Sequence, residues 1–245
     1  MSGDAGFVPF SAAHGVVVIA SAALVIGFVW LGRRWRGSPR QRRLELAVGW
    51  LGLAQYLAYL VWFGRAEGWD LKTVLPLQMC DVTAMAAVWV LVGGVGEGVG
   101  RRRAQTLVYF WGVVFSSQGF VTPTVRWGLE SPGFWFFWAT HLLILAAACY
   151  AVAVRRYRPT VGDCALAVAV SFVYLAVALS ANAMLGSNYG YVGRGLPGAA
   201  TIVDALGPWP LRVVWIALLG LAGMGLALLP WLVFKPRAPS SGALR

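Results

Sequence analysis

The chain has 245 residues, of which 59% are hydrophobic and only 12% are charged, whereas soluble domains average about 45–50% apolar and about 25% charged residues. These proportions exclude an ordinary soluble globule and predict an all-α, polytopic membrane protein. A net charge of +11 would suit a nucleic-acid-binding protein. The basic residues, however, lie in short loops between apolar segments, so we expect no nucleic-acid partner.

Seven apolar segments are long enough to cross a bilayer. A helix rises about 1.5 Å per residue, so roughly 20 mostly apolar residues span about 30 Å of hydrocarbon. The predicted spans, in chain order, are residues 15–32, 44–63, 74–95, 104–121, 134–154, 161–185 and 209–234. We therefore expect residues 1–245 to form a single bundle of seven transmembrane helices with a short cytoplasmic tail at 235–245. No basic residue precedes the first segment, so we expect it to be a span rather than a cleaved signal peptide.

The loop charges predict an orientation. Of the 20 basic residues, 15 follow the first, third, fifth and seventh predicted spans. They are Arg33, Arg34, Arg36, Arg40, Arg42, Arg43, Arg101, Arg102, Arg103, Arg155, Arg156, Arg158, Lys235, Arg237 and Arg245. Because basic loops stay in the cytoplasm, we expect the N terminus outside and the C terminus inside, in the plasma membrane. Membrane lipids are the expected partners, with anionic headgroups at these arginine loops; the pattern leaves the oligomeric state open.

Polar side chains gather in the outer halves of four consecutive predicted spans. A polar group in hydrocarbon is costly, so such a cluster indicates a site. The candidate substrate-binding residues are Gln78, Asp81, Gln118, Trp138, Asn182, Asn188 and Tyr189. The glycines between positions 93 and 100 do not form a P-loop, and no His/Cys pattern with metal-ligand spacing occurs. We therefore expect neither a metal nor a cofactor.

Two residues in this cluster are candidates for catalysis. From the helix rise, Cys80 lies some 6–9 Å and His141 roughly 10 Å below the outer ends of their spans, so the two can meet at one depth. A thiol needs an adjacent base to become a nucleophilic thiolate. Taken singly, each residue has a structural interpretation as well. A buried histidine often joins two helices by a hydrogen bond, and a free cysteine packs as a small hydrophobe.

Several motifs resemble those of the YwaF-like family of bacterial multi-pass membrane proteins. These motifs are Leu75–Cys80 (LPLQMC), His141, Asn188-Tyr189 and Leu206–Pro210 (LGPWP), and they span roughly residues 45–235. The position of Gln78 is often histidine in that family. The family in turn resembles an animal transmembrane protein that transfers fatty acyl chains between phospholipids through a cysteine. The resemblance implies that Cys80 accepts the acyl chain and that His141 is its general base.

Three functions are compatible with the sequence. The first is a lipid acyltransferase or hydrolase that uses Cys80 and His141. The second is a protein that binds or transports a small molecule or ion in the same outer polar cavity, where Asp81, Asn182 and Tyr189 would matter more than Cys80. The third is a non-catalytic structural membrane component, in which the polar groups only hold the helices together.

Overall fold

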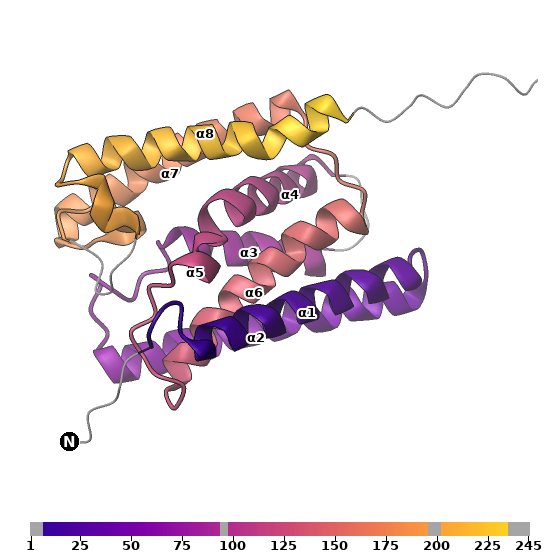
Figure 1. Cartoon of the computed structure of the whole chain (residues 1–245), viewed down its shortest axis with the longest axis horizontal. Coiled ribbons are helices and arrows are strands. Elements are labelled where there is room, and N and C mark those ends of the chain that lie inside the picture. Colours follow the sequence, from indigo (N-terminus) through magenta and orange to yellow (C-terminus); the bar gives the residue numbers. More distant parts are fainter. Residues whose placement is uncertain (1–6, 94–97, 196–201, 235–245) are drawn as a thin grey trace, which may run out of the picture.

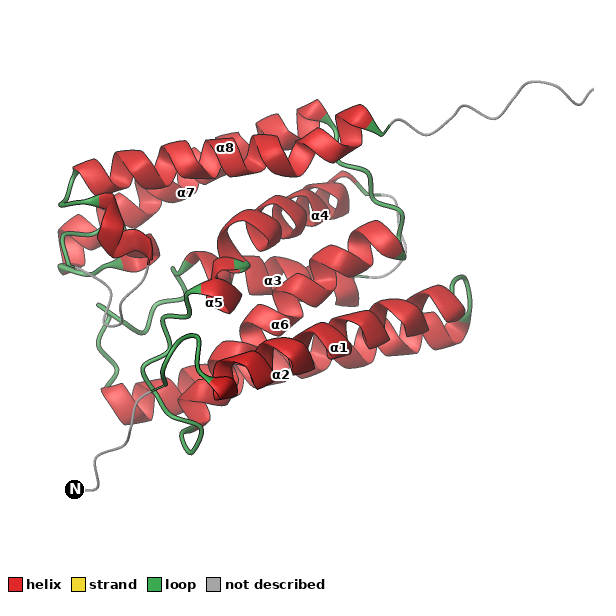
Figure 2. Cartoon of the chain, in the orientation of Figure 1, coloured by secondary structure: helices red, strands yellow, loops and turns green. Residues whose placement is uncertain are grey.

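The computed structural model describes residues 7–93, 98–195 and 202–234, and within them the chain is helical without strands (Figures 1 and 2). The predicted cytoplasmic tail, residues 235–245, lies outside the described residues. The α-helices are α1 Ala12–Arg34, α2 Pro39–Glu67, α3 Met79–Val92, α4 Val99–Trp111, α5 Gln118–Val121, α6 Pro132–Ala153, α7 Val161–Leu185 and α8 Leu211–Val233. A π-helix, η1 Gly112–Ser116, joins α4 to α5, and two 3-10 turns, η2 Tyr189–Tyr191 and η3 Ile202–Leu206, follow α7.

Five of these helices are long and apolar enough to cross a membrane: α1, α2, α6, α7 and α8. They overlap five of the seven predicted spans, and they confirm a membrane protein with several apolar helices. Of the apolar stretch of α6, 56% is buried, against 11% in α7. Helix α6 is therefore an inner helix, whereas α7 turns most of its apolar surface outward to lipid.

Helix α3 begins later than the third predicted span, 74–95, whose last two residues lie outside the described residues. Helix α3 has only 14 residues, about 21 Å at 1.5 Å per residue, which is shorter than the hydrocarbon core. Pro76 disfavours helical geometry in the residue before it. Gln78 then takes an extended conformation as N-cap, and its backbone N–H donates to Asp81 Oδ2 at 3.1 Å. This bond satisfies one of the free donors at the helix start, so the helix begins at Met79.

The fourth predicted span, 104–121, is not one regular helix. Helix α4 begins earlier, at Val99, and includes three arginines in its first turns. After Trp111 the chain passes through the π-helix η1 and then the short α5. A single extra residue per turn produces such a π-bulge, and hydrophobic periodicity does not reveal it.

Helix α6 is the centre of the bundle. It contacts α1, α2, α3, α4 and η1. Figure 1 shows α1 and α2 on one side, α7 and α8 on the other, and α3, α4 and α6 between them. Helix α7 contacts α4, and α8 contacts η1, so this outer pair packs on the helices that carry the π-turn.

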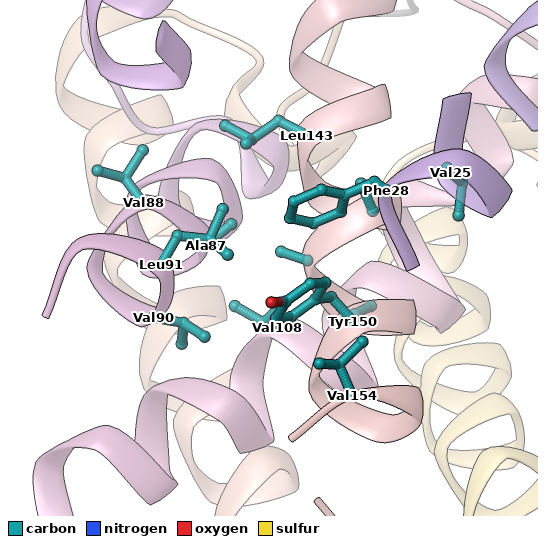
Figure 3. Close-up of a cluster of buried hydrophobic side chains, with 13 residues drawn as sticks. Val25, Phe28, Ala87, Val88, Val90, Leu91, Val108, Leu143, Tyr150 and Val154 are labelled. Carbon is teal, nitrogen blue, oxygen red and sulfur yellow. The ribbon is translucent and has the colours of Figure 1, made fainter. Parts of the chain in front are cut away.

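Glycines allow close packing between the outer and central helices. Tyr150 of α6 stacks on Phe28 of α1 with ring centroids 4.4 Å apart, inside the largest apolar cluster (Figure 3). Gly32 lies directly against the Tyr150 ring, and a Cβ at Gly49 would lie 3.0 Å from Leu91 Cβ. Small residues at these positions let the helix backbones approach, which is how membrane helices gain packing energy.

Arginines gather at one end of the bundle, where α3 ends. Arg42 donates to the carbonyl of Leu91 at 2.8 Å, while Arg101 and Arg155 donate to that of Val90 at 3.2 and 2.6 Å. These carbonyls have no partner within the helix, and cations favour the negative end of its dipole. Glu45 is fully buried beside them, 2.7 Å from Arg155 Nη2. We call this the basic end.

Candidate functional site

A cavity of about 390 Å³ lies at the other end of α3, among α3, η1, α5, α6, α7 and α8. Its volume is in the range of small-molecule sites. Five of the predicted site residues line it: Gln78, Cys80, Asp81, Gln118 and His141. The wall formed by α7 and α8 is mainly apolar, with Val168, Phe172, Leu175, Ile216, Leu221 and Met224, although Ser171 and Tyr174 of α7 also line it. The cavity therefore has a polar side and a hydrophobic side.

His141 has one ring nitrogen fixed by the backbone. Its Nδ1 lies 2.8 Å from the carbonyl oxygen of Phe137, one turn earlier on α6. Because a carbonyl only accepts, Nδ1 must carry the proton in this contact, and Nε2 of the neutral ring keeps a free lone pair. The ring also lies against Phe137, with centroids 4.2 Å apart. A Cβ on Gly119 would lie 2.7 Å from Nε2, so α5 approaches the imidazole closely.

Cys80 is the second residue of α3, and its thiol is free and partly buried. The short helix starts next to the cavity, so its first turn brings Gln78, Cys80 and Asp81 to the lining together. Helices α3 and α6 are in contact, which puts Cys80 and His141 on adjacent helices around one cavity. This arrangement can serve thiol chemistry in which the imidazole moves the proton.

Asp81 and Gln78 are engaged in local structure as well as lining the cavity. Asp81 accepts from the Gln78 backbone N–H, and Gln78 Oε1 accepts from the Gly190 N–H at 3.0 Å. The Phe137 carbonyl, and not Asp81, accepts the hydrogen bond from His141 Nδ1. Asp81 thus fixes the start of α3, and Gln78 ties that start to the loop after α7.

Three predicted site residues, Asn182, Asn188 and Tyr189, stabilise the loop after α7 by hydrogen bonds. None of the three lines the cavity. Asn182 Oδ1 accepts from the Tyr189 N–H at 2.7 Å, and Asn182 Nδ2 donates to the Tyr189 carbonyl. Asn188 Oδ1 accepts from Gly193 N–H at 2.9 Å. The Tyr189 hydroxyl donates to the Leu71 carbonyl at 2.6 Å. Asparagine side chains often bond nearby backbone in this way, and here they position Gly190 next to Gln78.

Trp138, the remaining predicted residue, lies in an aromatic cluster behind α5. The centroid of its ring lies 5.6 Å from that of Phe120 and 5.7 Å from that of His14. Trp138 is also outside the cavity lining. His14 Nε2 lies 3.0 Å from the Phe120 carbonyl oxygen, which joins α1 to α5. The cluster therefore supports the turn that carries Gln118 and Gly119.

The cavity also includes polar residues that the sequence did not single out as a site. Tyr191 closes one side, and its hydroxyl donates to Thr124 Oγ1 at 3.0 Å. Burial raises the pKa of Tyr191 to about 12, so its hydroxyl remains a donor at neutral pH. Ser116, at the end of the π-helix, is another lining residue. Ser116 belongs to the polar outer part of the predicted span 104–121, whereas Tyr191 lies between predicted spans and span polarity gives no signal for it.

An all-helical chain with several membrane-length apolar helices and an amphiphilic cavity is a multi-pass membrane protein. It belongs to the TMEM164 family, whose family model matches residues 9–228 and so covers every residue of the cavity lining. A search of curated proteins found no match, and a search of solved structures found none. Within the described residues, no group of three His, Cys, Asp or Glu side chains is placed to hold a metal ion.

Proposed function

We propose that this TMEM164-family protein transfers or hydrolyses lipid acyl chains, with Cys80 as nucleophile and His141 as general base. The observation that carries the proposal is the hydrogen bond from His141 Nδ1 to the Phe137 carbonyl, because it leaves Nε2 free as a base in the cavity that Cys80 lines. The resemblance to the YwaF-like family supports the same two residues. Gln78 and Gln118, which also line the cavity, are proposed substrate-binding residues.

The reaction has two balanced steps. In the first, the Cys80 thiol proton passes to His141 Nε2 and the sulfur attacks the ester carbonyl carbon. The ester C–O bond then breaks, and the leaving alkoxide takes the proton from His141 to give a lysolipid and a thioester on Cys80. In the second, a lysolipid hydroxyl or water gives its proton to Nε2 and attacks the thioester. Cys80 leaves as a thiolate and recovers the proton.

The shape of the cavity supports an amphiphilic substrate. Its polar side holds the two reactive residues and amide groups suited to an ester. Its apolar wall comes from α7 and α8, which also face the lipid, and it offers an environment for a hydrocarbon chain. Burying an acyl chain there contributes about 0.8 kcal/mol per CH₂ removed from water, so chain binding requires no charged contacts.

The proposal includes a topology. Helix α3 and the α4–η1–α5 segment are the two further spans, which makes seven, with the N terminus outside and the C terminus in the cytoplasm. The arginines at the basic end support it, since such residues remain in the cytoplasm and contact anionic headgroups. The cavity then opens in the outer half of the plasma membrane, and its lipid comes from the outer leaflet.

The test is an acyl-transfer assay with purified protein in detergent micelles, using phosphatidylcholine with a fluorescent acyl chain and lysophosphatidylethanolamine as acceptor. Cys80→Ala, Cys80→Ser and His141→Ala should each lower transfer and hydrolysis at least about 100-fold, as expected for residues that act in the transition state. Cys149→Ala and Cys164→Ala, at the two other free cysteines, are the controls. Full activity in Cys80→Ala would contradict the proposal. If the wild type shows no turnover and Cys80→Ser binds lipid as well as the wild type does, a binding or transport protein is favoured.

A further inference from the structure

The Ser116 hydroxyl is a buried polar group without a partner in the described structure. The residue is 5% exposed, and its Oγ makes no hydrogen bond to any described residue. A buried hydroxyl left unpaired costs roughly 1–3 kcal/mol, and membrane-buried polar groups face the same penalty. Beside a cavity, a bound ligand is one source of the missing partner.

Five other serine and threonine hydroxyls in or beside the helices are satisfied by their own helix. Each donates to the backbone carbonyl four residues earlier, as serine and threonine commonly do within helices. They are Thr83, Thr106, Ser117, Ser171 and Ser180. Ser116, the last residue of the π-helix, makes no such bond. The Gly112 carbonyl, four residues before it, accepts the backbone N–H of Ser117 at 3.0 Å.

The π-helix also contacts both of the helices that carry the proposed catalytic residues. Element η1 contacts α3, which carries Cys80, and α6, which carries His141. Ser116 lines the same cavity as both residues. Single π-turns occur preferentially at functional sites, where they re-aim side chains. Ser116 ends this π-turn beside the cavity, and its hydroxyl has no partner among the described residues.

We propose that Ser116 Oγ–H donates a hydrogen bond to the carbonyl oxygen of the lipid ester in the cavity. This inference rests on the proposed function and adds a third catalytic residue to it. When the Cys80 sulfur adds to the carbonyl carbon, the C=O π electrons move to this oxygen, and the Ser116 hydroxyl stabilises the resulting oxyanion. No proton leaves Ser116. The bond strengthens as negative charge develops and weakens again when the thioester carbonyl re-forms.

The experiment compares Ser116→Ala with Ser117→Ala, the next residue along, whose hydroxyl already bonds the Val113 carbonyl at 2.6 Å. With the fluorescent phosphatidylcholine assay, Ser116→Ala should lower kcat by about 100-fold, the loss typical of one oxyanion donor. KM should change little, and Ser117→Ala should behave as wild type. A long-chain alkyl trifluoromethyl ketone, which forms a tetrahedral adduct with a thiol, should inhibit Ser116→Ala more weakly by a factor similar to the loss in kcat/KM.

Two further measurements separate the outcomes. Alkylation of Cys80 by iodoacetamide and the thermal unfolding midpoint should be the same in Ser116→Ala and wild type. Wild-type kcat in Ser116→Ala would overturn the inference, and so would a loss of activity accompanied by slower alkylation and a lower unfolding midpoint. If instead Cys80→Ala keeps full activity, the proposed function itself fails, whatever Ser116→Ala does.

Discussion

His141 Nδ1 lies 2.8 Å from the carbonyl oxygen of Phe137, one helical turn away on the same helix. Backbone of a buried helix is among the most rigid parts of a membrane protein, so this bond fixes both the tautomer and the ring orientation. In soluble hydrolases a carboxylate usually orients the base. A carbonyl does so here without placing a further negative charge in the hydrocarbon. The proposed mechanism therefore requires that His141 is neutral and that its free nitrogen faces the cavity.

The contact between α5 and the imidazole gives a first prediction. A methyl group at Gly119 would lie 2.7 Å from His141 Nε2, so Gly119→Ala should push the ring away from its position. We expect transfer activity to fall at least about tenfold, since small misplacements of catalytic groups have large effects on rate. The thermal unfolding midpoint should change little, so the lower activity should not come from a loss of folded protein.

Gly225→Ala on α8 is the matched control, because no atom lies within 4 Å of the added methyl group. Alanine is the better helix former by about 1 kcal/mol, so this variant should keep its activity and be slightly more stable. Equal activity in the two alanine variants would show that the Gly119 contact does not position His141.

The second prediction concerns the buried ion pair at the basic end. Glu45 and Arg155 are 1% and 10% exposed, with 2.7 Å between Glu45 Oε2 and Arg155 Nη2. Glu45→Ala leaves the arginine charge unpaired in a buried place, which should lower the free energy of unfolding by about 3–5 kcal/mol. Thermal or SDS unfolding of the purified protein measures this loss.

The exposed pair of Glu67 and Arg126 provides the comparison. Its oxygen–nitrogen distance is similar, 2.9 Å, but its side chains are 32% and 49% exposed. Glu67→Ala should therefore cost less than about 1 kcal/mol. If both variants lose the same stability, burial does not govern the strength of these pairs.

The buried hydroxyl of Tyr191 should make the stability of the protein depend on pH. Burial raises its pKa from 10.0 to about 12. When the pKa of a group is higher in the folded state than in the unfolded state, the group stabilises the fold fully at pH values below the unfolded-state pKa. This stabilisation is lost as the pH rises through the folded-state pKa. The stability difference between wild type and Tyr191→Phe should thus be constant up to about pH 10 and shrink towards pH 12. Unfolding midpoints across this range test it, and a difference independent of pH would contradict the burial of this hydroxyl.

The proposed topology predicts which loops are reached from outside the cell. In a chain with its three native cysteines replaced by alanine, Lys72→Cys should react with a membrane-impermeant maleimide in intact cells. Arg40→Cys, at the basic end, should react only after permeabilisation. Both side chains are exposed, so reactivity reports the side of the membrane. Labelling of Arg40→Cys in intact cells would reverse the orientation and place the cavity in the inner leaflet.

Hydrophobic runs and charges predicted the membrane-length helices and the gathering of Gln78, Cys80, Asp81, Gln118 and His141. Span hydropathy is a long-range average, so it did not reveal that Pro76 and the Asp81 cap delay α3 until Met79. The π-turn that ends at Ser116 is a local change in backbone hydrogen bonding, which span hydropathy does not reveal.

The residues of the loop after α7 show a different limit. Asn182, Asn188 and Tyr189 have the polarity of a binding site, yet they bond to other parts of the chain. Their partners are the backbone of the loop, the Ser187 hydroxyl, and the backbone of Leu71 and Leu75. Polarity predicts that a side chain needs a partner, and only the fold decides whether the partner is backbone or ligand.

An acyl chain detected on Cys80 would be direct evidence that this residue is the nucleophile. Purified protein is incubated with a phosphatidylcholine of defined acyl chain, quenched in acid and measured by intact-mass and peptide mass spectrometry. We expect one acyl chain on the peptide that contains Cys80 in wild type, none in Cys80→Ala and far less in His141→Ala. Turnover without any adduct, or an adduct only on Cys149 or Cys164, would contradict catalysis by Cys80.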